Sequence, residues 1–282
     1  MDIRAHFDLG DYIAHPVGPM RATLTGVGTA LSADLTDALR YLQRRSESST
    51  GWLSHVLVTA THKDARITAF LSAWAYERHW LGDAIAALAG VGEAAVLKRR
   101  TLLRRFGDRL GPLREAIVSN VHGHSLTAVQ MTERLVDGWI VEAMLERAQS
   151  MAPNAVAADL DRVRSAVARQ GRFFAETATE ALAHSPAARA LAPRRLRRRT
   201  WPIGADREPA RSTAGALETL FGVDRDWAAA IDRRIDALPG LSGLGLVGRT
   251  AAKPGRRPLR IPSMFSWPLR RPAQLDRKDL RR

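Results

Sequence analysis

The chain has 282 residues, of which 45% are hydrophobic and 26% charged, a balance typical of a globular protein with one sizeable core. It contains no cysteine, which excludes disulfides, thiolate metal sites and cysteine nucleophiles and favours a cytoplasmic protein. No uncharged apolar run approaches the length of a membrane span, and the N-terminal stretch carries acids without an apolar core. We therefore expect neither a transmembrane helix nor a signal peptide.

The net charge of +14 is concentrated in two segments near the C-terminus. Residues 189–199 contain six arginines and no acid, and residues 249–282 contain 11 Lys and Arg against two Asp. These segments carry +6 and +9, which leaves −1 for the rest of the chain. A protein that binds nucleic acid over its folded face would spread its basic residues across that face. Any contact with nucleic acid or an anionic membrane is therefore expected in these two segments.

Apolar residues at helical spacing predict four long helices. We expect the first to begin after Ser32, a suitable N-cap residue, and to continue past Glu47 towards Trp52. The other three are expected at residues 64–89, 125–150 and 156–184, with a basic helix at 98–106 between the second and third. No segment alternates with the period of a strand. The pattern predicts an all-α protein, with a four-helix bundle at residues 31–186 after an N-terminal extension at 1–30.

Shorter helices follow the predicted bundle. They are expected near residues 187–199, 211–221 and 226–237, within a C-terminal helical extension at 187–248. Residues 243–248 are glycine-rich, but the pattern indicates no strand before them and no helix after them, so we exclude a phosphate-binding loop. From residue 249 to 282, Pro, Arg and Gly dominate without any periodicity, which predicts a disordered basic tail.

Three stretches, residues 62–77, 167–174 and 196–204, together with Leu238-Pro-Gly-Leu241, resemble a family of actinobacterial ferritin-like proteins. The resemblance spans roughly residues 30–248. It implies a ferritin-like four-helix bundle with a di-iron site, in which two helices each give a carboxylate and the other two each give a Glu-x-x-His pair. Residues three apart lie on the same helix face, so one helix can present both ligands to the same metals.

The sequence departs from that ligand pattern. The positions that match the family's ligands are Glu47, Arg78, Leu81, Asp137, Gln170 and Phe173. Four of them cannot coordinate iron in the family's manner, because Arg78 and Leu81 replace one Glu-x-x-His pair and Gln170 and Phe173 replace the other. In the third helix, either Asp137 or Glu133 takes the carboxylate position. We therefore predict a degenerate site without a metal cofactor.

The substitutions also predict a specific arrangement of the bundle centre. A buried guanidinium needs a carboxylate partner, so we expect Arg78 to pair with Glu47, Asp137 or Glu133, with Leu81 and Phe173 packed around the pair. The acids could instead form a residual acidic pocket, although paired interior acids are the more common arrangement.

Two further groups of residues are candidates for binding. His55, His62, His122 and His124 could form a metal cluster, but capping or solvent exposure is the stronger expectation. His79 is expected to pack between helices or to lie on the surface, in preference to a metal role. A candidate anion-binding segment contains Arg194, Arg195, Arg197, Arg198 and Arg199, and a solvated basic turn explains these arginines equally well.

Together these patterns favour a non-catalytic ferritin-like protein that acts as an interaction or regulatory scaffold. One alternative is an iron- and oxygen-handling protein with an atypical site built from Glu47, Asp137 and histidines. Another is a peripheral protein that binds an anionic membrane or nucleic acid through its basic C-terminal segments. A protein partner fits the first interpretation, and the sequence leaves the oligomeric state open.

Overall fold

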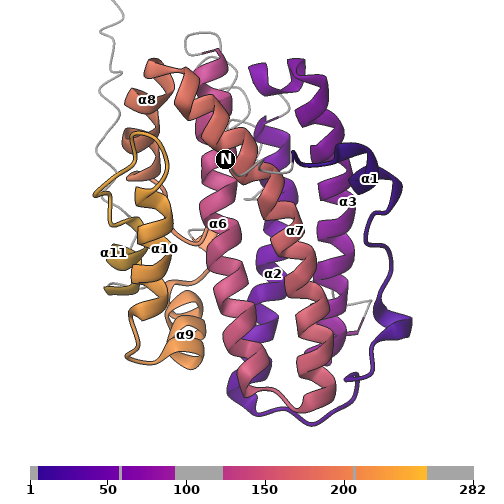
Figure 1. Cartoon of the computed structure of the whole chain (residues 1–282). Coiled ribbons are helices and arrows are strands. Elements are labelled where there is room, and N and C mark those ends of the chain that lie inside the picture. The colour runs from indigo at the N-terminus through magenta and orange to yellow at the C-terminus, as the bar shows by residue number, and fades with distance from the viewer. Residues whose placement is uncertain (1–5, 57–58, 93–122, 206–207, 253–282) are drawn as a thin grey trace, which may run out of the picture.

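The computed structural model describes residues 6–56, 59–92, 123–205 and 208–252, and the regular structure in these ranges is helical, without a strand. The predicted all-α class is therefore confirmed. Four long helices run alongside one another (Figure 1). They are α2 (Ala33–Val56), α3 (Ala65–Leu88), α6 (His124–Met151) and α7 (Asn154–His184). The helix expected at residues 98–106 lies outside the described residues.

Local signals explain where two of these helices begin. The Ser32 hydroxyl accepts a hydrogen bond from the Leu35 amide at 3.2 Å, and the Asp64 carboxylate accepts one from the Ile67 amide at 2.9 Å. Each bond satisfies an amide that has no partner within the first helical turn. The apolar stripes then face the core. The apolar residues that form these stripes are buried: Ile67, Phe70, Leu71, Trp74, Leu81, Ile85, Leu88, Met131, Leu135, Trp139, Leu160, Val163, Val167, Phe173 and Phe174.

Helices α2 and α3 pack closely at one crossing. A Cβ atom at Gly82 would lie 3.1 Å from the Ser46 Cβ, so the glycine permits an approach that a larger residue would obstruct. The Ser46 hydroxyl donates a hydrogen bond of 2.9 Å to the Arg78 carbonyl oxygen in the same region. The partner helices α6 and α7 form the other half of the bundle.

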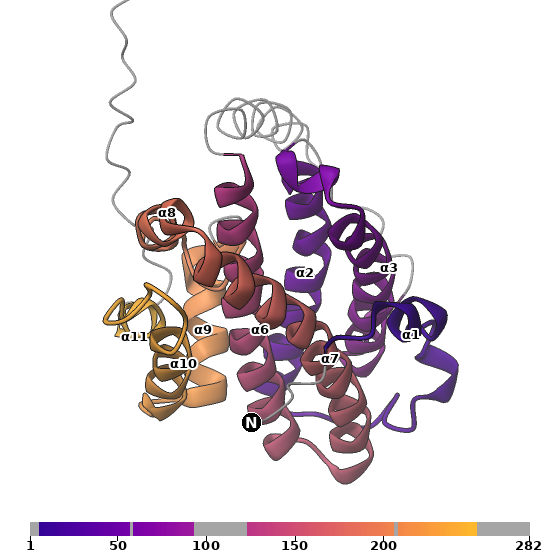
Figure 2. The same ribbon diagram turned by 45° about the horizontal axis from the view of Figure 1, so that its top comes forward.

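The C-terminal helices lie on the α2 and α6 side of the bundle (Figures 1 and 2). Three of them were predicted: α8 (Pro186–Leu196), α9 (Ala210–Phe221) and α10 (Asp226–Asp236). A fourth, α11 (Leu246–Ala252), was not. The Asp232 carboxylate accepts hydrogen bonds from the amides of Val247 at 3.0 Å and Gly248 at 2.8 Å, and so caps α11 from a distant part of the sequence.

Helix α11 corrects two expectations. A helix does begin within the glycine-rich segment at 243–248, since α11 starts at Leu246. No strand precedes it in the described part of the chain, and Asp232 binds the amides that a phosphate would use. The disordered tail was predicted to begin at 249, but residues 249–252 are helical and Ala251 is buried. The remaining residues, 253–282, lie outside the described ranges.

Acidic side chains of the bundle hold the N-terminal segment, which contains α1 (Leu9–Ala14), against α3 and α7 (Figure 1). Asp159 of α7 accepts hydrogen bonds from the Thr25 and Gly26 amides, both at 2.8 Å. Asp83 of α3 accepts two from the Arg21 guanidinium, at 3.1 and 2.7 Å. The segment is therefore part of the packed structure. None of the helices within the described residues has the length and apolar character needed to cross a bilayer.

Candidate functional site

Four charged side chains gather in the interior of the bundle, and we call them the arginine cluster. They are Arg45 of α2, Arg78 of α3, and Arg134 and Asp137 of α6, with exposed fractions of 2%, 7%, 4% and 4%. The cluster thus contains three guanidinium groups and one carboxylate. This excess of positive charge lies in the part of the bundle where the sequence resemblance places a metal site.

Asp137 is fully engaged by its neighbours. Its Oδ1 accepts hydrogen bonds from Arg45 Nη2 at 3.0 Å and from the Ile203 amide at 2.7 Å, and its Oδ2 accepts one from Arg134 Nη1 at 3.1 Å. These bonds join α2, α6 and the loop after α8. Asp137 therefore acts as a structural link between the bundle and the C-terminal helices.

Arg78 is buried as predicted, but the predicted ion pair is wrong. Within the part of the chain that the structure describes, no carboxylate lies within ion-pair distance of its guanidinium, and its Nε has no hydrogen-bond partner. Burial lowers the pKa of Arg78 to about 10, and the charge of Asp137 opposes that shift only from a distance. Arg78 is therefore a buried cation that lacks a direct counter-ion among the described residues.

The three expected partners of Arg78 are occupied or turned away. Glu47 lies on an exposed face of α2, where its Oε1 accepts a hydrogen bond of 2.5 Å from Gln43 Nε2. Glu133 is fully buried and accepts two hydrogen bonds, both 2.7 Å, from the guanidinium of Arg199. Glu133 and Asp137 are thus paired interior acids, as the more common arrangement predicts.

Arg134 combines one ion pair with aromatic contacts. Its guanidinium carbon lies 4.2 Å from the centre of the Trp52 ring and 5.5 Å from that of Trp74, which are cation–π distances. Its Nε and Nη2 have no hydrogen-bond partner, and burial lowers its pKa to about 9. Arg134 is therefore partly compensated by Asp137 and the two indole rings.

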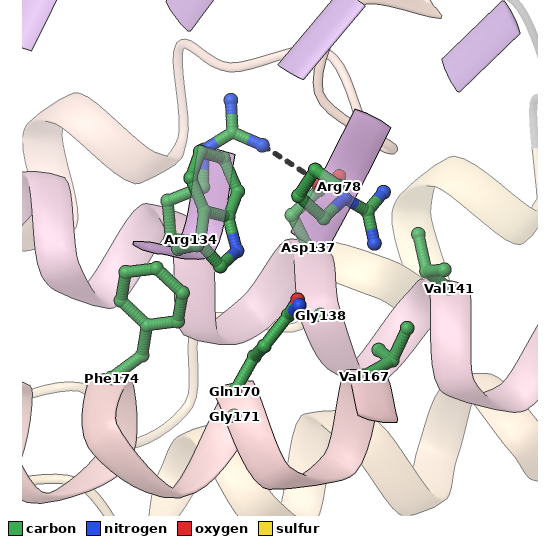
Figure 3. A pocket seen from close by; sticks show the side chains of 10 residues that line it. Arg78, Arg134, Asp137, Gly138, Val141, Val167, Gln170, Gly171 and Phe174 are labelled. Atoms are coloured by element: carbon green, nitrogen blue, oxygen red, sulfur yellow. Dashed lines mark hydrogen bonds and ion pairs between the residues drawn. The ribbon is translucent and has the colours of Figure 1, made fainter. Parts of the chain in front are cut away.

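A small pocket of about 20 Å³ adjoins Arg78, Arg134 and Asp137 (Figure 3). Gln170 reaches towards it from α7, and Trp74, Val141, Val167 and Phe174 supply its apolar walls. A space of this size accommodates about one water-sized species. The pocket brings together three of the six positions that match the family's ligands, namely Arg78, Asp137 and Gln170.

Gln170 serves a second buried polar centre, around Glu77, which sequence reasoning missed. Glu77 has an exposed fraction of 0% and accepts hydrogen bonds from Gln170 Nε2 at 2.8 Å, the Tyr12 hydroxyl at 2.5 Å and the Val17 amide at 2.8 Å. Arg169 forms an ion pair with it. Burial and the neighbouring Glu77 raise the pKa of Tyr12 above its ordinary value. The signal in the sequence was an acid at the position next to Arg78 on a largely apolar helix.

The remaining former ligand positions do not surround Arg78. Leu81 and Phe173 are buried, but neither lines the pocket. The Phe173 ring stacks on Phe70 with a centroid distance of 3.7 Å. Phe70 precedes Arg78 by eight residues, or about 12 Å along the helix axis. Phe173 therefore packs towards the N-terminal segment, and the expectation that it packs around an Arg78 ion pair is wrong.

The histidines and the arginine segment separate into different environments. His79 is exposed, which is one of its two expected placements, and its ring contacts Trp80. The side chains of His55, His62, His122 and His124 lie outside the described set. Arg194, Arg197 and Arg198 are exposed, Arg195 is partly buried and Arg199 binds Glu133. The described residues contain no group of three or more His, Cys, Asp or Glu side chains arranged to hold a metal ion.

Comparison of this chain with protein-family models, curated proteins and solved structures gives no match. The ferritin-like resemblance therefore stays a prediction from the sequence stretches that carry it. In the described ranges, the structure shows helices without a strand and a buried arginine cluster beside a small pocket.

Proposed function

We propose that this chain is a non-catalytic ferritin-like protein that acts as an interaction or regulatory scaffold. One observation carries the proposal: Arg45, Arg78 and Arg134 are buried near Asp137, the one carboxylate of the arginine cluster, which binds Arg45 and Arg134. A di-iron site relies on several carboxylates to neutralise its two cations. Guanidinium groups at that place repel a metal cation, and the repulsion is strong in an interior of low dielectric constant.

The roles of the buried acids support the same proposal. Asp137 binds the Ile203 amide, Glu133 binds Arg199 and Glu77 binds the Val17 amide. Each acid thus fixes a segment from outside the four long helices. A metal ion could use these carboxylates only after those contacts were broken, and the stranded partners would then destabilise the fold.

Metal content is the direct test. Protein expressed in iron-rich medium is expected to purify with far less than one iron per chain and to lack ferroxidase activity. Asp137→Asn is the matched variant, because it removes the one carboxylate of the arginine cluster and keeps its shape; the low iron content should not change. Two irons per chain by elemental analysis, lost in Asp137→Asn, would refute the proposal and favour the iron-handling alternative.

A second candidate function rests on the exposure of Arg194, Arg197 and Arg198 near the end of α8. These cations could bind an anionic membrane or nucleic acid. Binding to anionic vesicles and to duplex DNA, measured at rising salt, distinguishes the two targets. Replacing all three arginines with Gln should weaken binding. Replacing the exposed Arg211, Arg225 and Arg233 with Gln removes the same amount of charge and should leave binding unchanged. Equal effects of the two triple variants would exclude a specific site.

A further inference from the structure

The pocket beside the arginine cluster is lined by cations whose charge is not balanced. Arg78 is 7% exposed and Arg134 is 4% exposed, and both line the pocket. The Nε atoms of both side chains, and Nη2 of Arg134, have no hydrogen-bond partner. An ionised group in a protein interior is strongly destabilising unless it is paired and hydrogen-bonded. The arrangement therefore has unused donors and unused positive charge at the same place.

Two glycines keep the pocket open. Gly138 of α6 and Gly171 of α7 both line it, and a Cβ atom added at either would meet nothing within 4 Å. An alanine is the better helix former at such positions, so the glycines forgo helix stability and leave space. Trp74, Val141, Val167 and Phe174 supply the apolar part of the lining.

The charge and the size of the pocket select one class of ligand. Among the described residues, the pocket is lined by two guanidinium groups, Arg78 and Arg134, and by one carboxylate, Asp137. Their excess positive charge creates a positive potential, which attracts an anion and repels a metal cation. A volume of about 20 Å³ fits one water-sized species and is too small for phosphate or sulfate with their several oxygens. A water molecule could satisfy the donors but would leave the charge unbalanced.

We propose that this pocket binds one small monovalent anion, of the size of chloride, against the guanidinium of Arg78. Figure 3 shows that guanidinium on the Val141 side of Asp137, with Arg134 on the other side. The anion completes the charge balance of the arginine cluster and so stabilises the folded bundle. This proposal is independent of the scaffold function, because it concerns the stability of the fold and requires no partner.

Chloride itself is the probe. Thermal unfolding is followed by circular dichroism at pH 7 and constant ionic strength, with chloride gradually replacing methanesulfonate, a bulkier monovalent anion. A ligand that binds only the folded state raises the melting temperature along a curve set by its dissociation constant. We expect the melting temperature to rise with chloride in this way. Bromide should act similarly, and its anomalous scattering in crystals should place it beside Arg78.

Two variants and one control locate the effect. Arg78→Met should abolish the chloride response. Gly171→Ala adds a methyl group to the lining of the pocket and should shift the half-maximal chloride concentration upwards by about tenfold or more, because the methyl group takes up space that the anion needs. Gly215→Ala in α9 is the matched control, because Gly215 also has open space around its Cβ position but does not line the pocket. It should keep the full response.

Both glycine variants should melt at higher temperature than the parent without chloride, because alanine favours a helix. Because both variants gain this helix stability, a weaker chloride response in Gly171→Ala alone must come from the pocket. The proposal is overturned if chloride and methanesulfonate give the same melting temperature, or if Gly171→Ala and Gly215→Ala respond alike. Gly171→Ala decides the question even if Arg78→Met does not fold.

Discussion

Replacing Arg78 with methionine should stabilise the protein in a buffer that lacks small anions. Burial lowers the pKa of Arg78 well below the ordinary value of an arginine, to about 10, and this difference corresponds to a destabilisation of about 3 kcal/mol while the group is charged. The penalty is fully present at every pH below about 10, because the side chain is then protonated in both the folded and the unfolded state. It is therefore at its full value at pH 7.

Methionine removes the charge and keeps a long, flexible apolar side chain. It is shorter than arginine, so some packing is lost and the pocket grows, which costs about 1 kcal/mol. The expected net change is a gain of about 1–2 kcal/mol in the free energy of unfolding. Urea denaturation at pH 7 in methanesulfonate, followed by far-ultraviolet circular dichroism, measures it. In chloride the gain should shrink, because the bound anion already offsets the penalty in the parent protein.

Arg199→Met is the control, because it should lower the free energy of unfolding where Arg78→Met should raise it. Arg199 makes two hydrogen bonds of 2.7 Å to Glu133, whose side chain has no exposed surface, so its removal strands a buried carboxylate. The expected loss is about 3 kcal/mol, the lower end for a broken buried pair, because Arg199 is 35% exposed. If Arg78→Met instead loses more than about 1 kcal/mol in methanesulfonate, Arg78 has a stabilising partner and the reasoning from its isolation fails.

Three further changes test other contacts. Glu77→Gln should speed proteolysis of the N-terminal segment, because a side-chain amide cannot accept hydrogen bonds from Tyr12, Val17 and Arg169 together. An unchanged cleavage rate would contradict the anchoring role of Glu77. Asp232→Ala should raise hydrogen exchange at the amides of Val247 and Gly248, with a loss of about 1 kcal/mol, and equal protection would disprove the cap. Removing residues 253–282 should leave thermal stability nearly unchanged and weaken binding to polyanions, most clearly at low salt. A clear loss of thermal stability would mean that these residues contribute to the fold.

The long helices could be predicted because their signals are local. Ser32 and Asp64 cap helices from adjacent positions, and the apolar stripes repeat within each helix. Helix α11 was missed because its cap, Asp232, comes from α10. Helix α1 has a local cap, since Asp8 accepts a hydrogen bond from the Asp11 amide, but its six residues give too short a pattern. Sequence patterns therefore locate an element less well as its stabilising contacts become more distant.

The contacts at the centre of the bundle could not be predicted in the same way. The burial of Arg78 was predicted correctly, but its partner was not, because partner choice depends on how each helix is rotated. Glu47 and Arg45 are two residues apart and lie about 200° apart around α2, so only one of them can face the interior. The structure turns Arg45 inwards, where it binds Asp137. A pattern of apolar residues fixes that rotation too coarsely to decide between two such neighbours.

The surplus of positive charge follows from what the buried acids bind. Glu77, Glu133 and Asp137 each make a contact with a segment outside the four long helices, and these contacts fix the N-terminal segment and the C-terminal helices to the bundle. These three buried acids are therefore already bound to other groups. Its charge has to be offset by something other than those acids, because a cation this deeply buried is not stabilised by bulk water. A small anion from solution can do so without disturbing any contact that anchors the flanking segments, which is why the chloride response and the effect of Arg78→Met should change together.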